Sequence, residues 1–138
     1  MRYKISLLLL FLLMGCGPAH QQKSIAANLK KNKGKVIFSQ LYGPEWSRLY
    51  VFAPYSDEQQ ISKVIKHQFD KGVSSIASSD ASCLLVLTAD NGIVAVIEYK
   101  RSLGDFSKLY RSNGYSREEA VFVLESDEGW PVFKFYEN

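Results

Sequence analysis

The chain has 138 residues and a formal net charge of +3, from 17 lysines and arginines against 14 acidic residues. Two of these cations, Arg2 and Lys4, lie in the first 15 residues, so the remaining 15 basic side chains nearly balance the 14 acidic ones. A chain this close to neutral lacks the basic excess of nucleic-acid-binding proteins, and its length suits one small domain.

Residues 1–15 have the features of a secretory signal peptide. Arg2 and Lys4 are followed by an apolar run over residues 5–14 that only Ser6 interrupts. About ten apolar residues are too few for a permanent span, since a helix needs about 20 to cross the hydrocarbon core of a bilayer. A cationic start before a short apolar run is typical of a signal that is cleaved.

The end of this segment carries a specific motif. Leu13-Met14-Gly15-Cys16 places a leucine three residues before a cysteine and a small residue directly before it. This motif resembles the lipobox of bacterial lipoproteins, which implies cleavage before Cys16 and a diacylglycerol thioether on its sulfur. By analogy with Gram-negative lipoproteins, Gly17 after the cysteine permits transfer to the outer membrane, facing the periplasm, if the host is Gram-negative. The alternative is an ordinary cleaved signal in which Cys16 has no special role.

The next segment, residues 16–34, has little to bury. It is rich in Gly, Ala, Gln, Asn and Lys, and no acidic residue occurs between Cys16 and Pro44. We predict a flexible basic tether here, with some attraction of its lysines to anionic lipid. A short helical turn over residues 24–31 is the alternative.

The folding part is predicted to be a single domain over residues 35–138. The expected strands cover residues 35–41, 48–53, 83–89, 93–101, 119–125 and 130–136. Asp90-Asn91-Gly92 predicts a tight hairpin turn, and residues 126–129 join the last two strands. Residues 74–82 are expected to form a loop, and residues 103–114 an irregular link with one helical turn near residues 105–111. Pro131 indicates that the final strand begins there or lies at a sheet edge.

One helix, over about residues 57–71, is the clearest element of this domain. Ser56 and Gln59 have the spacing of a capping box, apolar side chains follow at helical intervals, and Gly72 supplies a stop. With mostly hairpin-connected strands, the expected fold class is α+β. We predict a mainly antiparallel sheet of five to six strands with this helix packed on one face.

Groups for catalysis are scarce in this chain. Its two histidines are His20, in the tether, and His67, which we expect on the helix surface among lysines. Cys83 precedes an apolar run and is expected to be a buried small residue rather than a reactive thiol. The sequence has no nucleotide-binding glycine motif and no cluster with the spacing of metal ligands. We therefore expect no catalytic residues, no metal, no cofactor and no enzyme activity.

Aromatic side chains offer the best candidates for a binding surface. Strand alternation puts Tyr50 and Phe52 on one face of their strand and Val51 on the other. A sheet with aromatics on both faces has either a second covered face or an exposed aromatic patch, which would mark a partner site. For each aromatic residue, packing in the core is the alternative. The candidate partner-binding residues are Tyr42, Trp46, Tyr50, Phe52, Tyr55 and Arg101.

Three classes of function remain open. We favour a membrane-anchored envelope lipoprotein that binds another protein, either neutralising a toxin or assisting envelope assembly. A structural or stress-linked envelope lipoprotein without a tight partner is the alternative, and a small enzyme is the third. The expected partners are the membrane, through lipid on Cys16, and a protein of the periplasm or envelope. Neither nucleic acid nor a small-molecule cofactor is implied.

Overall fold

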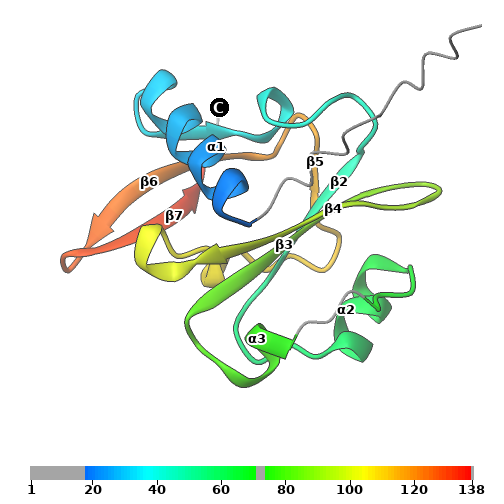
Figure 1. The fold of residues 1–138 in the computed structure, drawn as a ribbon. Coiled ribbons are helices and arrows are strands. Elements are labelled where there is room, and N and C mark those ends of the chain that lie inside the picture. The colour runs from blue at the N-terminus through cyan, green and yellow to red at the C-terminus, as the bar shows by residue number, and fades with distance from the viewer. Residues whose placement is uncertain (1–17, 71–73, 138) are drawn as a thin grey trace, which may run out of the picture.

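The computed structural model describes residues 18–70 and 74–137, which form an α+β domain (Figure 1). Its strands are β1 (Lys35–Ile37), β2 (Arg48–Phe52), β3 (Ser82–Ala89), β4 (Gly92–Lys100), β5 (Tyr115–Ser116), β6 (Val121–Asp127) and β7 (Trp130–Phe135). They form two antiparallel sheets, one in the order β1-β6-β7 and one in the order β4-β3-β2-β5. The predicted α+β class is therefore confirmed, although seven strands divide between two sheets where the sequence predicted one sheet of five or six.

The longest helix among the described residues, α1 (Pro18–Lys31), lies where the sequence predicted a flexible tether, so that prediction is wrong for these residues. Ile25 is fully buried in the core, and the Asn28 side chain accepts a hydrogen bond of 2.8 Å from the Ile37 amide. Ile25 and Asn28 thus hold α1 against the rest of the domain, although the other side chains of this helix are mostly polar. Within the described part of the chain, none of the helices is long and apolar enough to cross a membrane.

The second helix, α2 (Glu58–Ile65), begins with a capping box one residue later than predicted. The Asp57 carboxylate accepts a hydrogen bond of 2.8 Å from the Gln60 amide, and the Gln60 side chain accepts one from the Asp57 amide. Asp57 and Gln60 therefore take the roles that the sequence spacing assigned to Ser56 and Gln59.

This helix is also shorter than the predicted range of 57–71. Lys66 adopts a left-handed conformation with φ of 59° and ends it. The chain then turns back, because the Phe69 amide donates to the Ser62 hydroxyl at 2.9 Å and the Phe69 ring is buried. The expected stop at Gly72 lies outside the described residues. A five-residue helix, α3 (Ser74–Ser78), follows where the sequence predicted a loop.

Both predicted hairpins are confirmed. Strands β3 and β4 are joined by a two-residue turn at Asp90 and Asn91. Strands β6 and β7 are joined by Glu128 and Gly129, which have positive φ values of 51° and 83°, as a type I′ turn requires. Pro131 lies on β7, which is an edge strand as predicted.

Two predicted segments differ in detail from the structure. The first strand ends at Ile37, because residues 38–40 continue as a 3-10 turn that buries Phe38. The irregular link after β4 contains two 3-10 turns, at Arg101–Leu103 and Ser107–Leu109, and the second of these lies within the single helical turn that was expected near residues 105–111.

The core has two layers, one on each face of the four-stranded sheet (Figure 1). Val51 faces an aromatic cluster between this sheet, α1 and the three-stranded sheet, whereas Tyr50 and Phe52 face α2 and α3. At the centre of the aromatic cluster, the rings of Phe106 and Phe133 stack with centroids 4.0 Å apart. Aromatic residues on both faces of the sheet therefore reflect two covered faces.

A buried carboxylate, that of Asp105, joins the two sheets. Its backbone forms a bridge with Val132 of β7, and its side chain accepts hydrogen bonds of 2.8 Å from the Arg101 guanidinium and from the Ser107 amide. The fully buried thiol of Cys83 lies 3.6 Å from the same carboxylate, which confirms Cys83 as a buried residue. Burial raises the pKa of the Cys83 thiol to about 12 and keeps it protonated.

We expect Asp105→Asn to lower the free energy of unfolding by about 2 kcal/mol at neutral pH. Burial alone would raise the pKa of Asp105, but the hydrogen bonds from Arg101 and Ser107 outweigh it and lower the pKa. A carboxylate with a lowered pKa stabilises the folded state above its unfolded-state pKa, and this contribution is lost as the pH falls through the folded-state pKa. In urea unfolding, the difference between variant and native chain should shrink below about pH 4. Asp90→Asn at the exposed hairpin tip is the control, and an Asp105→Asn difference that does not change with pH would contradict the prediction.

Candidate partner-binding groove

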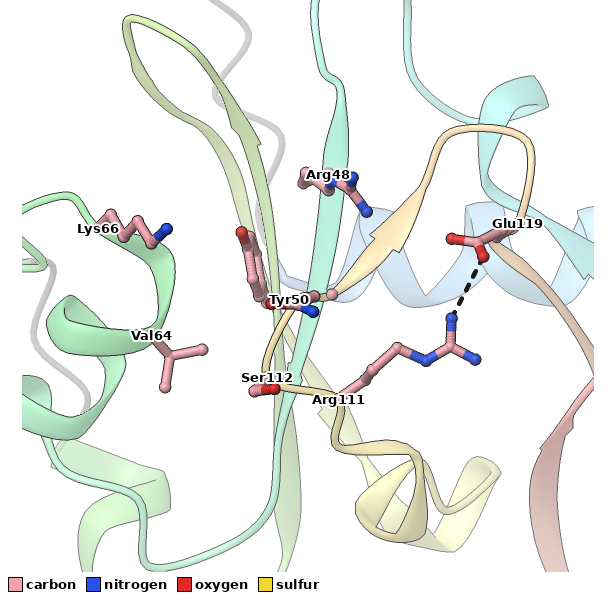
Figure 2. A pocket seen from close by; sticks show the side chains of 9 residues that line it. Arg48, Tyr50, Val64, Lys66, Arg111, Ser112 and Glu119 are labelled. Carbon is pink, nitrogen blue, oxygen red and sulfur yellow. Dashed lines mark hydrogen bonds and ion pairs between the residues drawn. The ribbon is translucent and has the colours of Figure 1, made fainter.

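Two adjoining pockets form a groove between α2 and the turn at residues 111–114 (Figure 2). Their volumes are about 460 and 540 Å³. The two pockets share Val64, Lys66 and Ser112, so they are continuous. We call this feature the basic groove, and it is lined by Arg48, Tyr50, Phe52, Ser56, Gln60, Lys63, Val64, Lys66, Tyr110, Arg111, Ser112, Asn113, Gly114 and Glu119.

Helix α2 forms one wall of the basic groove. Its last turn presents Lys63 and Val64, and Lys66 follows directly after the helix ends. Ile61 and Ile65 are buried against the sheet, so the helix is held with its other side toward the groove. In Figure 2, Val64 and Lys66 lie on one side of Tyr50, and Arg111 lies on the other.

The turn at residues 111–114 forms the other wall. The Gly114 amide donates to the Arg111 carbonyl at 2.9 Å and closes the turn. Gly114 has a φ of +62°, and a Cβ atom there would lie 2.7 Å from the Leu49 carbonyl oxygen of β2. Glycine therefore allows this turn to lie directly against β2. The Arg111 guanidinium lies over the Tyr115 ring, 4.1 Å from its centroid, which fixes the side chain at the groove.

Positive charge predominates in the basic groove. Its cationic side chains are Arg48, Lys63, Lys66 and Arg111, and the one carboxylate among its described lining residues is that of Glu119. Glu119 accepts a hydrogen bond of 2.8 Å from the Ser116 amide and lies 3.5 Å from the Arg111 guanidinium, along the dashed line in Figure 2. The Ser116 amide and the Arg111 charge lower the pKa of Glu119 and keep it ionised. Three cations then remain in excess, which favours an anionic partner.

The two halves of the basic groove differ in chemistry. The half beside Arg48 and Arg111 is lined mainly by charged and polar groups, whereas Phe52, Val64 and Tyr110 line the other half. Tyr110 is 53% exposed and lies at the rim. Aromatic and arginine side chains together are typical of the residues that dominate binding energy in protein interfaces. The groove thus suits a segment that carries a carboxylate close to an apolar side chain.

Two of the six predicted partner-binding residues lie in the basic groove. Tyr50 lines its polar half and Phe52 its apolar half, but both are buried and form the floor. Trp46 is 2% exposed, and its ring lies in the aromatic core with the Arg117 guanidinium 5.1 Å away. Its placement on a binding surface is therefore wrong, because the ring fills the core.

The other three predicted residues lie apart from the groove. Tyr42 is half-buried against the aromatic core, and Tyr55 is 63% exposed on the loop before α2 without lining either pocket. Arg101 is paired with Asp105 and lines a separate pocket near the exposed Trp130. The structure does not form the predicted aromatic surface, because side chains of β2 alternate between two covered faces.

Trp46→Ala is expected to lower the free energy of unfolding by about 3 kcal/mol without changing the basic groove. The loss is that of a large buried ring, whose removal leaves a cavity in the aromatic core. Guanidinium chloride unfolding followed by circular dichroism measures it, with Tyr55→Ala at an exposed site as the control. Partner binding that disappears while unfolding is unchanged would instead restore Trp46 as a binding residue.

The cationic residues of the basic groove could not be predicted from the sequence. Lys63 and Lys66 both precede a predicted surface histidine, His67, and have no pattern that distinguishes them from solvated lysines. The structure places His67 half-buried in the turn after α2. Arg48 and Arg111 are distant in the chain, and they meet because β2 pairs with β5. A single sequence contains no signal for that pairing.

The described residues contain no group of three or more His, Cys, Asp or Glu side chains that could hold a metal ion. Comparisons with protein-family models, with curated proteins and with solved structures found no match to this chain.

Proposed function

We propose that this chain is an envelope lipoprotein that binds another protein through the basic groove while lipid on Cys16 holds it on the membrane. Cys16 lies outside the described residues, and the lipobox-like residues before it support the anchor. In a Gram-negative host, the protein would face the periplasm from the outer membrane. This location suits either the neutralisation of a toxin or assistance in envelope assembly.

The observation that carries the proposal is an excess of positive charge beside an apolar floor. Arg48, Lys63 and Lys66 have no carboxylate partner among the ion pairs of the described residues. Each pocket has the volume of a typical ligand site, and the two are continuous. A segment of a protein, with acidic and apolar side chains in sequence, satisfies both halves at once. Complementary charge of this kind also speeds association and selects among partners.

Site-specific photo-crosslinking in intact cells tests this function. A photoreactive amino acid replaces Ser112, which is exposed and shared by both pockets, and in a control strain it replaces Asn91 at the tip of the β3–β4 hairpin. We expect one envelope or secreted protein to be crosslinked from Ser112 and not from Asn91. Mass spectrometry of the crosslinked peptide should find acidic residues beside the attachment point.

The crosslinking experiment also distinguishes the proposed protein-binding function from the alternatives. Equal amounts of crosslinked product from positions 112 and 91 would show that the partner contacts the protein nonspecifically and not through the groove. The absence of any crosslinked product from position 112 would favour a structural envelope role. A crosslink to a segment with no acidic residue would contradict the chemistry assigned to the groove.

A further inference from the structure

The exposed side of α1 carries a continuous lysine face, which we define as Lys23, Ala26, Ala27, Lys30 and Lys31. All five residues are exposed, whereas Ile25 and Asn28 on the other side of the helix are buried. The spacing of Lys23, Ala27 and Lys30 keeps their side chains on one side of the helix. Small alanines between the lysines leave this face flat.

The charge of the lysine face is not compensated nearby in the chain. No acidic residue occurs from Gly17 to Pro44, and no lysine of α1 takes part in an ion pair of the described residues. Lys30 and Lys31 lie in the last turn, where cations stabilise a helix through its dipole. That effect falls off within one turn, so it does not account for Lys23 in the middle of the helix.

The helix is also held firmly on the domain. The Gln21 and Gln22 side-chain amides donate to the carbonyl oxygens of Val96 and Glu98 on β4, at 3.4 and 3.5 Å. These bonds run to the outer edge of β4, an edge strand that α1 covers. Any force that orients α1 therefore orients the whole domain.

The position of Cys16 brings this helix to the membrane. Only Gly17 lies between Cys16 and Pro18, where α1 begins, so the two Cα atoms are two positions and at most about 7 Å apart. A lipid on Cys16 therefore leaves no room for a long tether, and α1 must start close to the headgroups.

We infer that the lysine face of α1 lies on the anionic phospholipid headgroups of the membrane that holds the lipid of Cys16, so that the basic groove faces away from that membrane. The inference rests on the proposed anchor. Helices α1 and α2 pack on opposite faces of the four-stranded sheet, so contact through α1 leaves the groove open to a partner (Figure 1). The lysine face has no large apolar side chain, so the helix stays at the level of the headgroups instead of inserting.

Fluorescence quenching on the lipidated full-length protein tests this orientation. One fluorophore is attached at Ala27→Cys on the lysine face, and in a second sample at Gln59→Cys on α2, both exposed positions. Cys83 does not compete for the label, because it is buried and its pKa is raised to about 12. The protein is reconstituted into phosphatidylcholine vesicles with or without phosphatidylglycerol, and a nitroxide-headgroup lipid serves as quencher. Mass spectrometry of each sample establishes whether Cys16 carries lipid.

We expect strong quenching at position 27 and weak quenching at position 59 when phosphatidylglycerol is present. Lys23→Gln with Lys30→Gln should reduce the quenching at 27, since each lysine near an anionic surface contributes about fivefold to affinity. Equal quenching at both positions, or no dependence on phosphatidylglycerol, in a protein that carries the lipid would overturn the orientation and leave the anchor standing. Absence of lipid on Cys16 would overturn the anchor, and the orientation with it.

Discussion

Reversing the charge of Lys63 and Lys66 together, as Lys63→Glu with Lys66→Glu, is expected to weaken binding of the crosslinked partner by about a hundredfold or more. Both lysines belong to the α2 wall, and Lys66 lines both pockets. After the change, carboxylates of the partner would face carboxylates across the groove, and such like-charge contacts cost several kcal/mol. Titration calorimetry of the purified, detergent-solubilised lipoprotein measures the affinity, and the salt dependence of binding should weaken in the variant.

A matched control is available on α1. Lys30→Glu with Lys31→Glu makes the same change of net charge, in the last turn of a helix as Lys63 is, but on the opposite face of the sheet. In detergent, this variant should bind the partner with an affinity close to that of the native chain. If both double variants weaken binding alike, the effect comes from the net charge of the protein and not from contact in the groove. Unchanged binding in the α2 variant would remove the groove from the interface.

Elements whose conformation is decided by a few neighbouring residues could be predicted from the sequence. The hairpin at Asp90 and Asn91 and the one at Glu128 and Gly129 follow from turn residues between apolar strands. The start of α2 was also predictable to within one residue, because capping depends on side chains three residues apart.

Features decided by distant contacts could not be predicted in this way. The polar composition of α1 indicates a tether, yet burial of Ile25 and the hydrogen bonds of Asn28 hold it as a helix on the domain. The end of α2 at Lys66 depends on burial of Phe69 rather than on a local stop signal. The basic groove exists only after β2 pairs with β5, and a single sequence does not reveal that pairing.

Phe106→Ala is expected to lower the free energy of unfolding by about 5 kcal/mol. The Phe106 ring is fully buried in a segment without regular strand structure. It stacks on Phe133 at 4.0 Å and meets Tyr99, Phe122 and Phe38 edge to face at 5.4, 5.8 and 6.4 Å. Each such ring pair contributes beyond the area that it buries, so removal of the ring loses several contacts and leaves a cavity between rigid neighbours.

The same substitution tests whether the two sheets unfold as one unit. Phe106 contacts Tyr99 of the four-stranded sheet and Phe133 of the three-stranded sheet, so its loss should destabilise both together. For Phe106→Ala we expect a single unfolding transition in guanidinium chloride, at a lower midpoint than that of the native chain. Tryptophan fluorescence, to which the buried Trp46 contributes, and circular dichroism should report the same transition. Phe106→Leu fills much of the space of the ring and should therefore lose less free energy of unfolding than Phe106→Ala. Tyr110→Ala, at the exposed rim of the basic groove, should change the free energy of unfolding by less than about 0.5 kcal/mol. Transitions that separate between the two probes would mean that the sheets are independent, and the aromatic cluster would then not be the contact that holds the groove and α1 in one rigid domain.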